Sequence, residues 1–314
     1  MQTRWPKNLE ILERCNNSPM HISVLLHESV EALKIKKGGI YVDATLGAGG
    51  HSHAMCEVNK GITIVGIDKD TDAINRSKEK LENSPCKFIF KEGSYDQVDE
   101  LLKEEGIEEV DGILFDLGMS SPQLDISGRG FSFKSDEPLL MTMKADPGEG
   151  DLTAYEIVNH FAEESIADII FGYGEEKRAK RIAKAIVKAR ETSPIRTTTQ
   201  LVEIITKSTP RFMFGKKGHP AMRTFQALRI ATNNELEELK SSLPKVFRLL
   251  KSGGRIVVIS FHSLEDRIIK RFFKDLEEKG SAVRITKKPL RPSEEEITSN
   301  PRSRSAKLRI LEKI

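Results

Sequence analysis

Acidic, glycine and histidine residues gather in one short segment of the chain, Asp43 to His51, with the sequence DATLGAGGH. Glycines in such a segment let the backbone approach a ligand where a side chain would collide with it. Asp68 follows at roughly the 20-residue interval expected for a carboxylate that accepts hydrogen bonds from ribose hydroxyls. The loop and the acid together predict a nucleotide-binding site.

The kind of nucleotide is narrowed by one position in this loop. A dinucleotide fingerprint has glycine at its first, third and sixth positions, but counting from Gly47 the sixth position is Ser52. S-adenosylmethionine carries no phosphate, so its loop needs close approach and an acceptor for its ammonium group, a role that suits Asp43. His51 and His53 do not share a helical face, so no metal site is predicted there.

A second polar loop, DLGMSSPQL at 116–124, follows an apolar segment. Methyl transfer to an exocyclic base amine requires acceptors against the amine hydrogens, because the nitrogen lone pair is delocalised into the ring. Asp116, Ser120, Ser121 and Gln123 offer such acceptors. The same Ser and Pro residues are equally typical of a turn that caps the next element. No cysteine lies in this loop, which favours an amine or oxygen acceptor over a ring carbon.

These loops require a framework of buried strands. Nearly all-apolar segments of this kind are typical of parallel strands buried on both faces, covered by helices. The predicted strands are 39–45, 61–68, 87–93, 111–118 and 254–261, and an antiparallel edge pair is predicted at 282–286 and 306–313. Helical periodicity at 151–170, 174–190 and 197–207 fills much of the long gap before 254. A long helical pattern after residue 220 is predicted to end at the glycines of KSGG, 251–254. We therefore predict an α/β, Rossmann-like sheet with an inserted helical domain.

Composition limits the class of protein but not its activity. The chain has 314 residues, 38% hydrophobic and 31% charged, and a net charge of +3. Its apolar runs are shorter than the ~18 residues of a membrane span, and its first residues have no apolar signal core, so a cytoplasmic location is expected. The odd number of widely spaced cysteines, Cys15, Cys56 and Cys86, predicts reduced thiols rather than a disulfide framework.

Several long motifs resemble one family, the bacterial RsmH (MraW) methyltransferases. They are HISVLLHESVEAL at 21–33, DATLGAGGHS at 43–52, GIDKD at 66–70, DGILFDLGMSSPQLD at 111–125, RGFSF at 129–133, YGEEKRAKRIAKAI at 173–186, TFQALRIATNNEL at 224–236, SGGRIVVISFHSLEDRIIK at 252–270 and NPRSRSAKLR at 300–309. The resemblance implies a class I methyltransferase that uses S-adenosylmethionine to methylate the exocyclic N(4) of a cytosine in the decoding centre of small-subunit (16S) ribosomal RNA. It implies ribosomal RNA or the assembled small subunit as partner and no membrane. It leaves the oligomeric state open, a homodimer included.

The resemblance also assigns residues and domains. It implies that Gly49, Gly50, His51, Asp68, Tyr95, Asp116 and Gln123 form the cofactor site, to which Asp43 is added from its chemistry. Asp116, Ser120 and Ser121 are the expected catalytic residues. The expected domains are an extension at 1–20, a methyltransferase domain at 21–124 and 218–314, and a helical substrate-recognition domain at 125–217.

One stretch departs from the family pattern. After RGFSF the family typically has Pro-Leu-Asp-Met-Arg-Met-Asp, whereas this chain places Leu140, Thr142 and Lys144 at the charged positions. A rival hypothesis follows, in which the chain binds cofactor and RNA as a non-catalytic assembly factor. A DNA amino-methyltransferase is a weaker alternative, because the loop at 116–124 lacks the second proline and the aromatic residue of that class.

Two further segments carry charge. Lys177, Arg181, Lys184 and Lys188 fall on one face of the helix predicted at 174–190, which is either an RNA-phosphate stripe or a solvated face. In FHSLED at 261–266, the spacing of Ser263 and Asp266 predicts a helix cap. His262 remains a candidate substrate contact.

Overall fold

The computed structural model describes residues 23–148, 150–209 and 219–314, with the side chains of Ser121 and Pro122 left out of that description. The predicted extension at 1–20, with Cys15, lies outside the described residues. The described residues form two compact units, one within residues 1–119 and 237–314 and the other within residues 120–236. Each unit is described by itself.

The first unit is built on a sheet whose described strands have the order β3-β2-β1-β4-β5-β7-β6. The strands are β1 (Ile40–Asp43), β2 (Thr63–Asp68), β3 (Lys87–Glu92), β4 (Val110–Asp116), β5 (Leu250–Ser260), β6 (Ala282–Arg284) and β7 (Lys307–Lys313). Strands β1 to β5 pair in parallel, and β7 pairs antiparallel with both β5 and β6. Every predicted strand is confirmed, including the edge pair.

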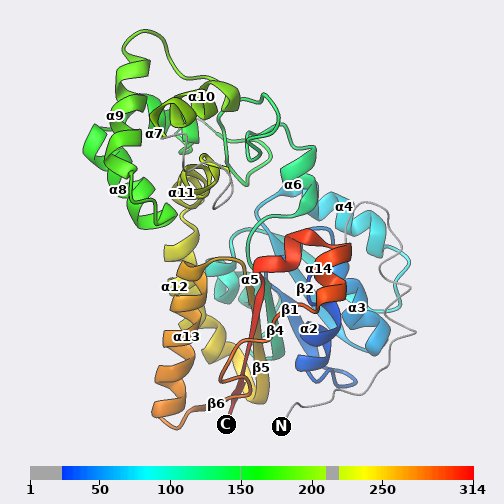
Figure 1. The fold of residues 1–314 in the computed structure, drawn as a ribbon. Coiled ribbons are helices and arrows are strands. Elements are labelled where there is room, and N and C mark those ends of the chain that lie inside the picture. Colours follow the sequence, from blue (N-terminus) through cyan, green and yellow to red (C-terminus); the bar gives the residue numbers. More distant parts are fainter. Residues whose placement is uncertain (1–22, 149, 210–218) are drawn as a thin grey trace. The chain divides into compact units, whose positions relative to one another are not determined.

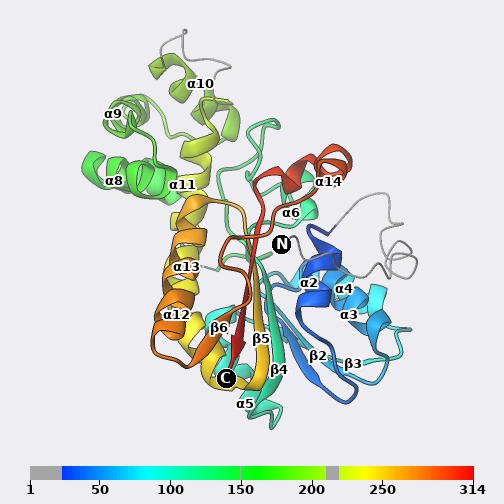
Figure 2. The same cartoon turned by 60° about the horizontal axis from the view of Figure 1, so that its bottom comes forward.

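Helices cover both faces of this sheet (Figures 1 and 2). They are α2 (Leu26–Ala32), α3 (Gly50–Val58), α4 (Thr71–Leu81), α5 (Val98–Glu104), α12 (Glu235–Leu249), α13 (Ser263–Glu278) and α14 (Glu294–Ser299), with short 3-10 turns η2 (Tyr95–Gln97) and η4 (Pro301–Ser305). Alternate strand residues enter two separate cores. On β4, Ile113 and Phe115 pack beneath α12 and α13, whereas Leu114 packs toward α2 and α3. This double burial explains the nearly all-apolar strands.

The second unit is mainly helical. Its elements are α6 (Ser121–Asp125), α7 (Ala154–His160), α8 (Glu163–Gly174), α9 (Ala179–Arg190), α10 (Thr198–Ser208) and α11 (Met222–Asn233). Helix α8 packs against both α9 and α11, and α10 packs against α9. Residues 219–236 therefore belong with this unit by contact, although the expected boundary placed them in the sheet domain. The chain has the predicted fold class, an α/β, Rossmann-like sheet with an inserted, mainly helical unit.

Two local predictions are wrong. The helical pattern after residue 220 was expected to run until the glycines at 253 and 254. Instead Asn234, in the left-handed region at φ 53°, ends α11, and α12 ends at Leu249. The glycines lie within β5, where the pairing with β4 shifts register between Val110 and Gly112.

Among the helices of the described residues, none combines the length and apolar character that a membrane span requires.

The second wrong prediction concerns the cysteines. Cys56, near the end of α3, and Cys86, just before β3, form a disulfide, with their Cα atoms 5.8 Å apart. Their separation of 30 residues gave no sign of this contact. The fold produces it, because the end of α3 and the start of β3 meet at the amino end of the parallel strands.

Candidate cofactor and transfer site

The loop after β1 and the acid at the end of β2 are in direct contact. The backbone N–H of Gly47 donates to Asp68 Oδ2 at 2.8 Å, and the N–H of Asp70 donates to Asp68 Oδ1 at 2.9 Å. Burial raises the pKa of Asp68 to about 6, although these two hydrogen bonds lower it. The predicted constellation of loop and acid is therefore one structural unit.

Glycine is required in this loop for reasons that the structure shows. Gly49 has φ +68°, and it is the residue that precedes α3. A Cβ atom on Gly50 would lie 2.1 Å from the Ser23 Oγ atom, so a side chain there would collide with the protein itself. The space beside Gly50 is thus occupied by Ser23, in the segment before α2, which packs over the loop.

Asp43 ends β1 and is 1% exposed. Its Oδ2 accepts from the Ser52 hydroxyl at 2.7 Å, and its Oδ1 accepts from the Thr45 N–H at 3.4 Å. Ser52 occupies the position where a dinucleotide fingerprint has glycine. Its hydroxyl is the group that donates to Asp43, which a glycine could not do. Burial raises the pKa of Asp43 to about 6, against the effect of its hydrogen bond with Ser52.

Asp116 ends β4 beside this loop, and its backbone N–H donates to Thr45 Oγ1 at 2.7 Å. Its Oδ1 atom is buried and has no hydrogen-bond partner among the described residues. Its Oδ2 lies 3.7 Å from His51 Nδ1, which is beyond hydrogen-bond range, while Nε2 of that ring is 3.2 Å from the Val24 carbonyl. Burial, then the charges of Asp43 and Glu265, raises the pKa of Asp116 well above its ordinary value.

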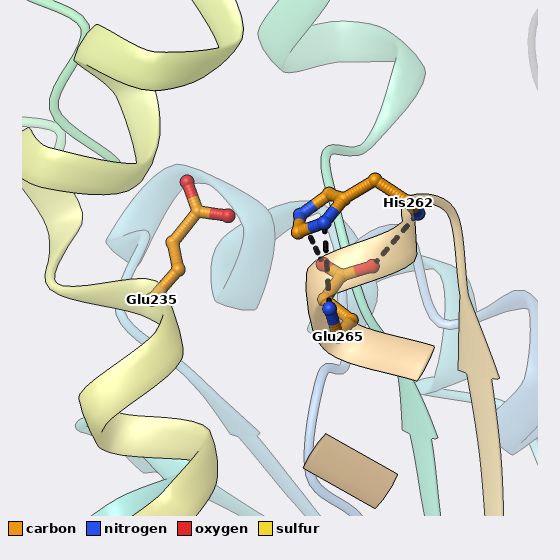
Figure 3. A group of neighbouring side chains, drawn as sticks. All are labelled: Glu235, His262 and Glu265. Atoms are coloured by element: carbon orange, nitrogen blue, oxygen red, sulfur yellow. Dashed lines mark hydrogen bonds and ion pairs between the residues drawn. The ribbon is translucent and has the colours of Figure 1, made fainter. Parts of the chain in front are cut away.

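Glu265 was not singled out from the sequence. It lies in the first turn of α13 and is buried, and its Oε2 accepts from the N–H groups of Phe261 and His262 at 2.8 and 3.2 Å. His262 Nδ1 in turn accepts from the Glu265 N–H at 3.4 Å, and Figure 3 shows the two side chains facing each other. This reciprocal pair is the helix cap, so the expected cap formed by Ser263 and Asp266 is wrong.

Asp266 has a different role in the same unit. Its two carboxylate oxygens accept from Lys307 Nζ at 3.0 Å and from Arg309 Nε at 2.6 Å, both on β7. Two basic residues of the motif at 300–309 are therefore used inside the sheet unit. They hold the start of α13 against the antiparallel strand.

Tyr95 follows β3 in the turn η2. Its ring meets Phe115 of β4 edge to face, with the ring centroids 5.6 Å apart. Tyr95 also packs at the edge of the core that α12 and α13 cover. The structure thus places the Tyr95 ring against Phe115, the residue before Asp116 in β4, a contact that the sequence alone did not predict.

The residues from Ser120 onward belong to the second unit. The Ser120 N–H donates to Gln123 Oε1 at 3.0 Å, and the Gln123 N–H donates toward Ser120 Oγ at 3.4 Å. These reciprocal bonds are those of a cap at the start of α6, which is the turn alternative left open above. The side chain of Ser121 lies outside the described residues.

The stretch that departs from the family pattern is held mainly through its backbone. Arg129 Nη1 donates to the carbonyls of Thr142 and Met143 at 3.4 and 2.7 Å. Asn233 accepts from the Met143 N–H and donates to the Met141 carbonyl, each at 2.7 Å. Because these contacts use main-chain atoms, the side chains at 140, 142 and 144 can differ while the stretch keeps its course.

The chain is similar to known proteins over nearly its whole length. The model of the MraW methylase family matches residues 18–314. A protein of Caldicellulosiruptor bescii named ribosomal RNA small subunit methyltransferase H is 50% identical over 312 residues, 94% of this chain and 99% of that protein. The protein of that name in Coprothermobacter proteolyticus is 46% identical over 295 residues, 93% of this chain and 96% of its own.

One solved structure is also similar to this chain, at low identity. It is a Streptococcus mutans protein described as a methyltransferase in complex with SAH, with a TM-score of 0.47, 12% identity, and coverage of 94% of this chain and 100% of that one. The resemblance drawn from the motifs is confirmed by the family match.

Proposed function

We propose that this chain, which belongs to the MraW methylase family, transfers a methyl group from S-adenosylmethionine to small-subunit ribosomal RNA, at the exocyclic N(4) of a cytidine in the decoding centre. The observation that carries the proposal is the near full-length match to relatives named for methylation of this RNA. The carboxyl end of the sheet supports it, because acidic side chains and a glycine loop meet there.

The cofactor site is proposed at the ends of β1, β2 and β4. Bound S-adenosylmethionine supplies an electrophilic methyl group on a sulfonium. Asp68 has two oxygens already fixed by backbone N–H groups, so its carboxylate is oriented in advance for ribose hydroxyls. The loop from Asp43 to His51, with Tyr95, Asp116 and Gln123, completes the proposed site.

The fit of this site to a cationic donor rests on Asp116. A buried carboxylate oxygen without a partner is unfavourable unless a ligand supplies the missing interaction. The sulfonium brings a positive charge to this site, and the acceptor amine brings polarised N–H groups. Either one could supply the interaction that the carboxylate oxygen lacks. The residues present therefore fit the cofactor that the family uses.

In the proposed transfer, the amine nitrogen forms a bond to the methyl carbon as the carbon–sulfur bond breaks. The products are the thioether, the methylated amine and one proton. Asp116 is the proposed acceptor against an amine hydrogen, with Ser120 and Ser121 as further acceptors. These groups orient the amine rather than form a covalent intermediate.

Helix α9 supplies support for an RNA substrate. Arg181, Lys184 and Lys188 lie on α9, whereas Lys177 lies in the turn before this helix, which begins at Ala179 and not at the predicted residue 174. All four are exposed, and none forms an ion pair with another described residue. On α13, by contrast, Lys274 pairs with Glu278 at 2.9 Å. Unpaired cations in a row are suited to backbone phosphates, so we propose that α9 contacts the RNA.

Transfer of labelled methyl groups tests the enzyme against the assembly-factor hypothesis. The protein is incubated with labelled S-adenosylmethionine and either small subunits or free RNA from a strain that lacks the modification. We expect label on a cytidine in one of these substrates. Bound cofactor and bound RNA without label would instead support the assembly factor.

A variant pair tests the role of α9 through RNA binding measured at several salt concentrations. Replacing Lys184 and Lys188 with glutamine is expected to weaken RNA binding and to lower the salt dependence by roughly 0.7 per lost phosphate contact on single-stranded RNA. Replacing Lys274 with glutamine is the matched control, since that lysine has an acidic partner on its own helix. Equal effects of both changes would contradict a specific contact by α9.

A further inference from the structure

Three acidic side chains approach one another at the carboxyl end of the parallel strands. Asp43 ends β1, Asp116 ends β4, and Glu265 lies in the first turn after β5. Asp43 and Glu265 are close enough that their charges raise the pKa of Asp116. Like charges are thus gathered at the point where the strand order reverses direction, between β1 and β4, which is where ligands of such sheets bind.

The three carboxylates differ in how their own chain satisfies them. Asp43 accepts from Ser52 and Thr45, and Glu265 accepts from two backbone N–H groups. Asp116 keeps a buried oxygen with no partner, and no lysine or arginine of the described chain forms an ion pair with it. The negative potential of the cluster is therefore directed at whatever meets Asp116 Oδ1.

Methyl transfer changes the charge of the cofactor. The donor carries a positive sulfonium, whereas the product is a neutral thioether of nearly the same shape. We infer that Asp116, reinforced by Asp43 and Glu265, recognises the positive charge at this position, so that the site binds the charged donor in preference to its own neutral product. This inference rests on the proposed function and adds the basis on which donor and product are distinguished.

The roles within the cluster are distinct. Asp116 meets the ligand, and Glu265 acts through Asp116 as a positioning residue that adds negative potential behind it. Facing Asp116 from the neighbouring elements are Asp43 on β1, His51 on α3 and Glu265 on α13. The ring of His51 is fixed by the Val24 carbonyl, so its Nδ1 stays turned toward the Asp116 carboxyl group.

A proton should accompany the recognition of charge. Burial and its two acidic neighbours favour the protonated form of Asp116 in the free protein, because they raise its pKa. A bound cation favours the carboxylate and lowers that pKa, so the charged donor should displace a proton on binding. The thioether product lacks the charge at the sulfur, so it should displace fewer protons. Proton release thus reports on charge recognition without any measurement of turnover.

Calorimetry of the ligand-free protein with three ligands tests the inference. The ligands are S-adenosylmethionine, S-adenosylhomocysteine, and sinefungin, an analogue with a protonated amine in place of the sulfonium. We expect the two cations to bind more tightly than the thioether. In buffers of different ionisation enthalpy, we expect more protons to be released on binding of the two cations than on binding of the thioether.

Variants on one strand separate charge from shape. Asp116→Asn keeps the size of the side chain and should lower the affinity for both cations by on the order of 10-fold or more, with little change for the thioether. Glu265→Gln should lower the affinity for both cations, relative to that for the thioether, by a smaller factor. It should also reduce proton release. Asp111→Asn, at the opposite end of β4, is the control and should change neither quantity.

The outcomes are distinguishable. Equal weakening of all three ligands by Asp116→Asn, or equal proton release with donor and product in the unaltered protein, would overturn charge recognition while leaving the proposed methyltransferase standing. Failure of the unaltered protein to bind any of the three would overturn the proposed function itself. The proton measurement needs no variant, so a misfolded variant does not remove the test.

Discussion

Strand β4 has one aspartate near its start, Asp111, and another at its end, Asp116, and the two carboxylates lie in opposite environments. Asp111, at the amino end, accepts from Lys251 Nζ at 2.8 Å and from the Ile40 N–H at 3.0 Å. Partial burial raises the pKa of Asp111, but its bonds to Lys251 and Ile40 outweigh burial and hold the pKa below the ordinary value. Asp116, at the carboxyl end, has its pKa raised and one oxygen without a partner.

The same contrast extends across the sheet. The amino end holds the disulfide between Cys56 and Cys86 as well as the ion pair of Asp111. The carboxyl end gathers Asp43, Asp68 and Asp116, each with a raised pKa. At the amino end the protein itself supplies the bonding partners of these side chains. At the carboxyl end an oxygen of Asp116 lacks a partner among the described residues, which a ligand could supply. The difference indicates that stability and ligand affinity can be altered separately.

Loss of the disulfide should have the largest effect on stability. Replacing Cys86 with serine opens the link between α3 and β3 and should lower the free energy of unfolding by roughly 2–4 kcal/mol. Affinity for S-adenosylmethionine should stay the same, because the link lies at the amino end. Denaturant unfolding and calorimetry on one preparation measure both.

Reduction of the unaltered protein is the control for that variant and should cause the same loss of stability. A thiol titration of the unfolded protein, before and after reduction, reports how much of the link is present. If the Cys86 variant lost cofactor affinity in proportion to stability, the separation of the two ends would be wrong.

The pH dependence of stability should distinguish the ends by sign. The pKa of Asp43 is about 6 in the folded protein, above its ordinary value of 3.8. Its contribution to stability is therefore fully present below pH 3.8 and is lost as the pH rises through about 6, by at most roughly 3 kcal/mol. Asp111 has a lowered pKa, so its contribution is instead lost as the pH falls.

Unfolding of the ligand-free protein between pH 4 and 8 measures this dependence. Asp43→Asn should flatten the fall in stability across pH 6, because the amide does not titrate there. Asp111→Asn should leave that region of the curve unchanged. A curve that keeps its slope in the Asp43 variant would assign the effect to other groups.

Asp68 should matter for the cofactor more than for the fold. Asp68→Ala removes the proposed acceptor for the ribose hydroxyls. It should weaken the binding of S-adenosylmethionine by about 10- to 100-fold, or about 1.5–3 kcal/mol. RNA binding should remain. Glu92→Gln is the matched control, since Glu92 lies opposite Asp68 in the register of the neighbouring strand β3 but is exposed. Equal loss of cofactor and RNA binding would refute the assignment of Asp68.

The fold was largely predictable because its strands are buried on both faces. The segments at 39–45 and 61–68 contain β1 and β2 with ends shifted by one or two residues. Helix ends were less predictable. The glycines at 253 and 254 look like a helix stop in the sequence, yet they serve a register shift between β4 and β5, which depends on a partner strand far away in the chain.

The candidate site was partly predictable for a similar reason. Asp43, Asp68 and Asp116 each end a buried strand, and the carboxyl ends of parallel strands meet. Glu265 follows β5 in the same way and obeys that rule, but its capping pattern drew attention to Ser263 and Asp266 instead. The disulfide left no local signal, because its two cysteines meet only after the sheet has formed.

The smallest effect is expected where the amino end is most exposed. Lys251 is 40% exposed, so its ion pair with Asp111 should contribute below about 1 kcal/mol to the free energy of unfolding. A double-mutant cycle with Lys251→Met and Asp111→Asn measures that coupling, and cofactor affinity should change less than 3-fold in every member of the cycle, roughly 0.6 kcal/mol. A larger change in affinity would mean that strand β4 transmits a disturbance from one end to the other. The unpartnered oxygen of Asp116 would then reflect the state of the whole strand, rather than a local arrangement kept for the ligand.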